Sequence, residues 1–216
     1  AAKGNEILDS LNLDQKDGDG FRLMPSGERL SLPITAIVAA FEDYPGISEM
    51  VAEHWKDNLG VHATVQSLER SLAGERDVAN QVLIDIWESS GRDAVLITPQ
   101  HLLAVAGGGN PDRLGMEWFD SGGAAGREPV SSYIREQQTL YTEGISTSDA
   151  DRYLEIAQRV VEINCEMVNP ITTVMNKPTY TSIIKRNVHN IPNPLPFSYH
   201  AQTSGNGFPE TWWLDD

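Results

Sequence analysis

Cysteine is almost absent from this 216-residue chain, which contains only Cys165. A single cysteine can form no intramolecular disulfide bond and no cysteine-rich zinc site. The cysteine content leaves the cellular compartment open, because cytosolic proteins and large secreted domains can both fold without disulfides. The sequence also lacks an apolar run of about 18 residues, the length that a transmembrane helix needs. We therefore expect no direct insertion into a membrane.

Positive charge is scarce, with 16 Lys and Arg residues against 31 Asp and Glu residues and a formal net charge of −15. A nucleic-acid-binding protein needs a basic surface to neutralise phosphates, and an anionic membrane attracts basic segments. The composition therefore argues against nucleic acid as a partner. With 40% hydrophobic residues, the chain has ordinary globular usage and can form one large domain or a domain with an appendage.

Hydrophobic periodicity predicts an α/β fold. Residues 29–36 and 61–68 alternate like half-buried strands, and residues 47–59 between them place apolar side chains on one helical face. This order is typical of a βαβ unit with a right-handed crossover. Residues 82–87 are apolar on both faces, so we expect a central strand there. Pro33 indicates an edge or entry position in the first strand.

The second half of the chain contains two further amphipathic helices, at residues 130–141 and 150–168. Residues 148–151 have the pattern of a capping box, and the apolar stripe that follows, which includes Cys165, predicts a buried helix face. From residue 171 onward the sequence predicts short strands and an extended, proline-rich tail.

Residues 89–128 contain two glycine-rich tracts and should be irregular, as functional or mobile segments often are. Trp118 lies between these tracts, and no periodicity explains it as a core residue. Stacking on a ligand and filling of a hydrophobic gap are both open for its ring. Trp87 ends the third strand, where α/β sheets present ligand-facing residues, although packing is the favoured role there.

No catalytic, metal or phosphate-binding constellation is complete. Ser121 lies in an Asp-Ser-Gly-Gly segment like that of trypsin-like proteases, but no histidine has a matching context. Asp17-Gly18-Asp19-Gly20 resembles half of an EF-hand loop without its bidentate Glu, so we expect a turn. Gly107-Gly108-Gly109 does not extend to a dinucleotide-binding pattern. We expect no catalytic residue, no metal and no cofactor.

Segments along almost the whole chain resemble the family 5 extracellular solute-binding proteins, the peptide- and oligosaccharide-capturing subunits of ABC importers. They are residues 6–11, 17–22 and 52–61, Trp87, residues 118–123 (Trp-Phe-Asp-Ser-Gly-Gly) with Glu128-Pro129, and the helix 149–168 followed by Pro170-Ile171. The resemblance implies an α/β fold with a mixed sheet flanked by helices, namely lobe III of a type II periplasmic-binding-protein-like fold.

The resemblance also implies a division of the chain. Residues 1–169 correspond to lobe III, and residues 170–216 to a crossover strand and C-terminal segment that packs on lobe I, which is missing here. Because the sequence lacks an initiator Met and a signal segment, we expect a fragment of a longer protein. That protein would be extracellular or periplasmic, either tethered to the membrane or secreted through the missing segment.

The implied function is non-catalytic capture of an oligopeptide or oligosaccharide for ABC permease subunits. Peptide-binding members carry an acidic residue shortly after the tryptophan, where this chain has Ser90, and the Trp-Phe-Asp-Ser-Gly-Gly segment is closer to oligosaccharide binders. The residues expected to contact the solute are Trp87, Trp118, Phe119 and Asp120, the last as an acceptor for hydroxyl groups. Two alternatives stay open, a serine hydrolase using the Ser121 region and a non-catalytic protein-interaction module.

Overall fold

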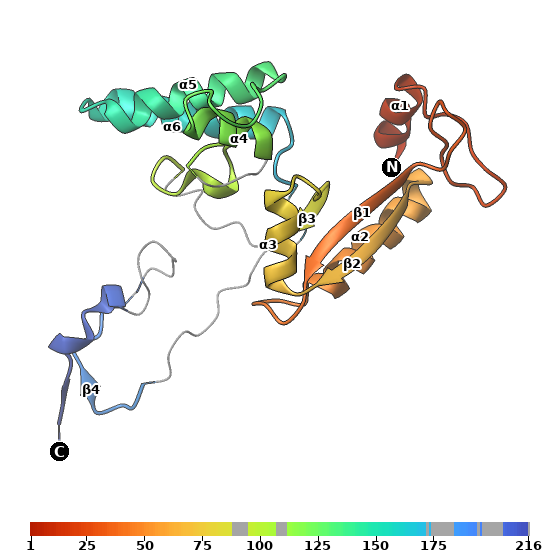
Figure 1. Cartoon of the computed structure of the whole chain (residues 1–216). Helices are drawn as coiled ribbons and strands as arrows, with labels where there is room; N and C mark the ends of the chain where they lie inside the picture. The colour runs from red at the N-terminus through yellow and green to blue at the C-terminus, as the bar shows by residue number, and fades with distance from the viewer. Residues whose placement is uncertain are drawn as a thin grey trace. The chain divides into compact units, whose positions relative to one another are not determined.

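The structure is a computed structural model that describes residues 1–87, 95–106, 112–171, 173, 184–193, 195 and 205–215. The chain divides into two compact units, Ala1–Glu88 (unit 1) and Ser89–Asp216 (unit 2) (Figure 1). The division expected between residues 169 and 170 stays a prediction. Ser90 and the glycine tract at residues 107–109 lie outside the described residues.

Unit 1 is built on a three-stranded sheet with the order β2-β1-β3. β1 (Ser31–Ile37) pairs in parallel along its whole length with β2 (His62–Leu68). On its other side, β3 (Ile84–Ile86) pairs in parallel with β1 residues 34–36. The helix α2 (Tyr44–Leu59) connects β1 to β2 and packs against both strands. The predicted α/β class and the strand–helix–strand order are confirmed.

Two expectations for this sheet are wrong within the residues that the structure describes. β3 is an outer strand, because a short apolar run does not distinguish an outer strand from a central one. β1 is the central strand, so Pro33 does not mark a sheet edge. The pairing with β3 begins at Ile34, one residue after Pro33, and the missing proline N–H therefore leaves that ladder intact.

A buried arginine joins the remaining parts of unit 1. Arg22 is only 2% exposed and lies in the segment between α1 (Ala2–Ser10) and β1. Its guanidinium donates hydrogen bonds to a carboxylate oxygen of Asp9 at 2.6 Å, to Asn5 Oδ1 at 2.6 Å and to the carbonyl oxygen of Leu59 at 2.7 Å. The same group also donates to the carbonyl of Leu13. Arg22 thus ties α1 to the C-terminal end of α2.

Unit 2 contains a short 3-10 helix, η1 (Pro99–His101), and three α-helices: α4 (Arg113–Asp120), α5 (Ser132–Ser146) and α6 (Ala150–Glu166). The helices α5 and α6 pack against each other. Its core gathers apolar side chains from the loop before α4 and from α6: Val95, Leu96, Leu102, Leu103, Val105, Ile156 and Val160. The two predicted helices are confirmed, whereas α4 was expected to be irregular.

The structure corrects two details of α6. Its N-cap is Asp149, whose carboxylate accepts from the N–H groups of Asp151 and Arg152, so Ser148 does not form the predicted capping box. Cys165 is exposed rather than buried, because the buried face follows Ile156, Val160 and Ile163. The predicted stripe was therefore offset from the buried face of α6: it contained Val160 but neither Ile156 nor Ile163.

The C-terminal part of unit 2 contains a two-stranded antiparallel ladder, as the sequence predicts. β4 (Val188–His189) pairs with β5 (Trp213–Leu214), and the rings of His189 and Trp213 stack with centroids 4.2 Å apart. The short 3-10 helices η2 (Gly205–Gly207) and η3 (Pro209–Thr211) precede β5.

Candidate functional site

An aromatic cluster lies at the carboxyl ends of the strands of unit 1. Trp87 directly follows β3, and its ring centroid is 5.2 Å from that of Tyr44 and 5.8 Å from that of Phe41. The guanidinium carbon of Arg70 lies 5.2 Å from the centroid of the Trp87 ring. Because parallel strands end at the same edge, the segments after β1, β2 and β3 meet here. We name Phe41, Tyr44, Arg70 and Trp87 the strand-end cluster.

The strand-end cluster combines a buried base with an exposed surface. Tyr44 is 3% exposed, whereas Phe41 is 63% exposed and Arg70 is also exposed. Within the part of the chain that the structure describes, Arg70 forms no ion pair, not even with the adjacent Glu69. The carboxylate of Asp43 caps α2 by accepting from Gly46 N at 3.1 Å. The cluster therefore offers aromatic surface beside a cation without a carboxylate partner.

Sequence reasoning found Trp87 but missed Phe41 and Arg70. Both residues follow a predicted strand by at most four positions, since β1 ends at Ile37 and β2 at Leu68. A search for aromatic and charged residues just after each strand would have found them, because ligands of α/β sheets bind outside the carboxyl ends of the strands.

The other predicted residues lie in unit 2, where Trp118 and Phe119 line an open groove of about 710 Å³ between α4 and α5. Trp118, Phe119 and Gly122 form one side of it. The α5 residues that line it recur every three or four positions and so share one helix face: Arg135, Gln138, Thr139, Thr142, Glu143 and Ser146. We name this the α4–α5 groove.

Charged groups of the α4–α5 groove have partners within the protein. Arg135 donates to the carbonyl oxygen of Pro129 at 2.6 Å. Glu143 accepts two hydrogen bonds from Arg152, at 2.7 and 3.1 Å, and this guanidinium holds the pKa of Glu143 below its usual value. Arg135 and Glu143 are therefore engaged within the protein, and the ring of Trp118 supplies aromatic contact surface in the groove.

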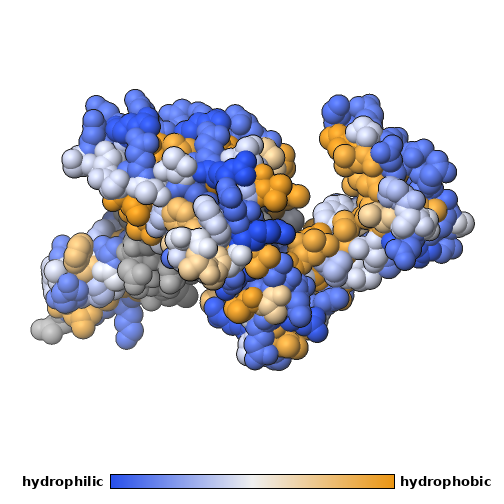
Figure 2. Space-filling view, turned by 45° about the horizontal axis from the view of Figure 1, so that its top comes forward, coloured by the Kyte–Doolittle hydropathy of each residue, from blue (hydrophilic) through white to orange (hydrophobic). Residues whose placement is uncertain are grey.

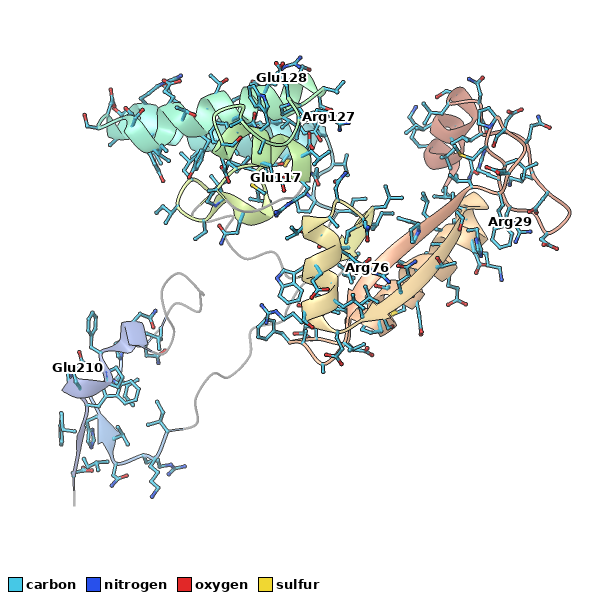
Figure 3. All side chains as sticks on the ribbon, viewed as in Figure 1. Arg29, Arg76, Glu117, Arg127, Glu128 and Glu210 are labelled. Carbon is cyan, nitrogen blue, oxygen red and sulfur yellow. The ribbon has the colours of Figure 1, made fainter. Side chains whose placement is uncertain are left out.

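A glycine-rich turn packs back onto α4 and explains the Gly-Gly motif. Gly123 N donates to the Trp118 carbonyl at 2.8 Å, and Arg127 N donates to the Leu114 carbonyl at 3.0 Å. Gly126 has φ +72°, and a Cβ there would lie 2.3 Å from the Leu114 carbonyl oxygen. This motif builds the turn, and Figure 3 labels Arg127 on it.

Three further predicted residues have structural contacts. Asp120 accepts a hydrogen bond from Ala106 N at 2.9 Å, and Phe119 packs edge-on against Tyr141 with centroids 6.2 Å apart. The Ser121 hydroxyl accepts from Ala125 N at 2.8 Å and so belongs to the glycine-rich turn. These contacts give no support to Ser121 as a nucleophile. Trp118 and Phe119 share the α4–α5 groove, and Trp87 belongs to unit 1.

The Asp17-Gly18-Asp19-Gly20 segment forms the expected turn. Asp17 accepts from the N–H groups of Asp19 and Phe21, and both aspartates bind Arg29 at 2.6 Å.

The described residues contain no group of three or more His, Cys, Asp or Glu side chains placed to hold a metal. No helix in the described ranges has the length and apolarity needed to cross a membrane. Hydrophilic residues cover most of the face seen in Figure 2.

The fold is that of a part of the periplasmic solute-binding proteins. No protein-family model matches the sequence, and no curated protein matches it. The oligopeptide-binding protein OppA aligns with 98% of this chain, with a TM-score of 0.68 and 22% identity. The periplasmic binding protein MelB from Agrobacterium fabrum C58, solved in complex with stachyose, aligns with 74% of the chain, with a TM-score of 0.60 and 16% identity.

A periplasmic oligopeptide-binding protein of an oligopeptide ABC transporter from Thermotoga maritima aligns with 76% of this chain and 28% of its own, with a TM-score of 0.51 and 15% identity. The chain spans 35% of the OppA chain and 23% of the MelB chain. These likenesses confirm the fold expected from the resemblance, that of family 5 solute-binding proteins, over a part of their length.

Proposed function

We propose that this chain is part of the solute-binding component of an ABC importer. It would capture an extracellular or periplasmic solute, an oligopeptide or an oligosaccharide, and deliver it to the permease subunits. The observation that carries the proposal is the alignment of nearly the whole chain with OppA, a protein named for binding oligopeptides. MelB, whose structure contains stachyose, supports the same class of function. The proposed role is binding without catalysis.

The proposed contact residues are Trp87 in the strand-end cluster, Trp118 and Phe119 in the α4–α5 groove, and Asp120 at the end of α4. Flat aromatic faces can pack on a sugar ring or on the apolar part of a peptide. The Asp120 carboxylate would accept hydrogen bonds from solute hydroxyl groups. Support for Trp87 comes from its position directly after β3, at the ligand-binding edge of α/β sheets.

We further propose that residues 1–169 form lobe III of the longer protein and that residues 170–216 pack on its lobe I. The longer protein would be tethered to a membrane or secreted. Support comes from the alignment, in which the chain accounts for only 35% of OppA. Since half of the contacts to the solute would come from lobe I, the chain alone should bind weakly.

Ligand-observed NMR can test this function on the 216-residue chain. Saturation transfer to stachyose or to trialanine should occur in the millimolar range and should weaken in Trp87→Ala and Trp118→Ala. Trp55→Phe is the matched control, because Trp55 lies on α2 outside both sites. Micromolar binding by this chain would contradict the proposal that lobe I supplies half of the contacts to the solute. Equal saturation transfer in all variants would contradict the proposed contacts of Trp87 and Trp118.

A fluorophosphonate probe tests the hydrolase alternative directly. We expect no labelling, because the Ser121 hydroxyl accepts from Ala125 N within a turn. Labelling that disappears in Ser121→Ala would instead establish a nucleophile and overturn the binding-only function.

A further inference from the structure

We propose that the strand-end cluster binds a carboxylate group of the captured solute through Arg70, while an adjoining ring or apolar group of the solute packs on Phe41 and Trp87. This inference rests on the proposed function and specifies the chemical class of the solute. Stacking alone would suit a neutral sugar because it needs no charge partner. Arg70 places a positive charge beside the Trp87 ring, and this charge suits an anionic solute.

Arg70 has no carboxylate counter-charge among the described residues. Acidic residues outnumber basic ones by 31 to 16, and several guanidinium groups of the chain form ion pairs with them. Arg29 binds Asp17 and Asp19, each at 2.6 Å, and Arg152 binds carboxylates in the same way. Among the described residues, Arg70 has no such carboxylate, and its positive charge is available to a ligand.

Contact with Trp87 restrains the Arg70 side chain. The guanidinium carbon of Arg70 lies 5.2 Å from the centroid of the Trp87 ring, in the range of a cation–π contact. A guanidinium group held over a ring keeps its N–H donors at its edge, where a carboxylate can accept two parallel hydrogen bonds. Trp87 therefore restrains the side chain that would hold the anion.

Arg70 also stands at a helix N-terminus. It is the first residue of α3 (Arg70–Val78), and the side chain of the N-cap residue Glu69 does not bind the helix N-terminus. The free N–H groups of a first helical turn favour negative charge. Arg70 and this helix end therefore contribute the same sign of potential. Both lie where β2 ends, at the ligand-binding edge of the sheet.

Two kinds of solute carry a carboxylate beside a group that can stack. One is an acidic oligosaccharide, and the other is a peptide with its C-terminal carboxylate. Both use the same chemistry at Arg70, and matched probes separate them. Trigalacturonate is compared with its neutral methyl ester, and the peptide Ala-Ala-Phe is compared with its C-terminal amide.

The experiment uses the 216-residue chain labelled with 5-fluorotryptophan, in which each of the five tryptophans gives a ¹⁹F resonance. Resonances are assigned by single Trp→Phe substitutions. An anionic probe should shift the Trp87 resonance and bind at least about tenfold more tightly than its neutral counterpart, as expected for a charge-assisted bidentate contact. The sugar or the peptide pair that behaves so identifies the source of the carboxylate.

The matched variants are Arg70→Gln and Arg76→Gln, which both remove a guanidinium from α3. Arg76, labelled in Figure 3, donates to Gln66 at 3.2 Å and lies in the last turn of the helix. We expect the preference for the anionic probe to disappear in Arg70→Gln and to persist in Arg76→Gln. A preference that survives Arg70→Gln overturns the inference.

The remaining outcomes separate this inference from the function on which it rests. Equal binding of acid and ester, and of acid and amide, overturns the role of Arg70 but leaves solute capture intact. If no probe shifts any tryptophan resonance, both proposals fail. A shift confined to Trp118 places the solute in the α4–α5 groove and overturns the assignment to the strand-end cluster.

Discussion

Replacing Arg22 with Met should strongly destabilise unit 1. Met keeps much of the apolar stem but removes the guanidinium, which donates to Asp9, Asn5 and the carbonyl of Leu59 at 2.6 to 2.7 Å. The arginine side chain is 2% exposed, whereas that of Asp9 is 53% exposed and can regain water. The partly buried Leu59 carbonyl loses its guanidinium donor. Removing one partner of a buried charged network costs about 3–5 kcal/mol, and the exposure of Asp9 favours the lower end.

Urea unfolding followed by ¹⁹F NMR measures this effect in unit 1 alone. Trp55 lies on α2, so its resonance reports the folded fraction of the unit that Arg22 holds together. Arg127→Met is the matched control, because Arg127 is exposed and belongs to unit 2, and its effect on the Trp55 transition should stay within about 0.5 kcal/mol. A loss below about 1 kcal/mol in Arg22→Met would refute the reasoning, since the network would then contribute no more than an ordinary surface ion pair.

Three further predictions concern unit 2. Asp149→Ala should lower the free energy of unfolding by about 1 kcal/mol, because it removes the N-cap of α6, whereas Ser148→Ala should change it little. Equal losses in chemical denaturation would instead show that Ser148 takes part in capping α6, as the capping-box pattern predicted. Gly126→Ala should disrupt the turn that packs against α4 and lower the midpoint of thermal unfolding, because a φ of +72° is strained for alanine and the new Cβ would overlap the Leu114 carbonyl oxygen. An unchanged midpoint would contradict this prediction. The pKa of Glu143 is lowered in the folded state, so its bond to Arg152 stabilises the fold above the unfolded pKa and loses that effect as pH falls through the folded pKa. The stability difference between wild type and Glu143→Gln should therefore shrink as the solution is acidified, and a constant difference in pH-dependent melting would argue against the ion pair.

Local patterns in the sequence predicted the strand–helix–strand unit of unit 1. The strands β1 and β2 alternate cleanly, and α2 lies between them in the sequence, so a βαβ unit follows from neighbouring residues alone. The helix α4 was missed because glycine-rich segments flank its eight residues and hide its period. Its boundary depends on contacts of the following turn, such as the one from Arg127 N to the Leu114 carbonyl.

The candidate site was predicted only where one residue stood out by its type. Tryptophan is rare, and this made Trp87 and Trp118 visible in the sequence. Arg70 and Phe41 are ordinary residues in their own segments. They become a cluster with Trp87 only because parallel register brings the ends of three strands to one edge, although the chain separates them by many residues. Their positions just after two predicted strands are a local signal, but which strands are neighbours in the sheet is set by tertiary structure.

The net charge of the sequence likewise does not reveal the local charge at a site. A chain with a charge of −15 would be expected to repel anions, yet the strand-end cluster presents Arg70 without a carboxylate partner among the described residues. A bound group responds mainly to charges within a Debye length, about 8 Å at physiological ionic strength, whereas the net charge is a sum over the whole surface. Added salt would screen the distant acidic residues before it screens a direct contact between Arg70 and a carboxylate. Salt weakens the attraction between Arg70 and an anionic solute, but it also weakens the repulsion of that solute by the acidic residues of the rest of the chain. The affinity for the anionic solute should therefore fall less with added salt than it would for a single exposed ion pair.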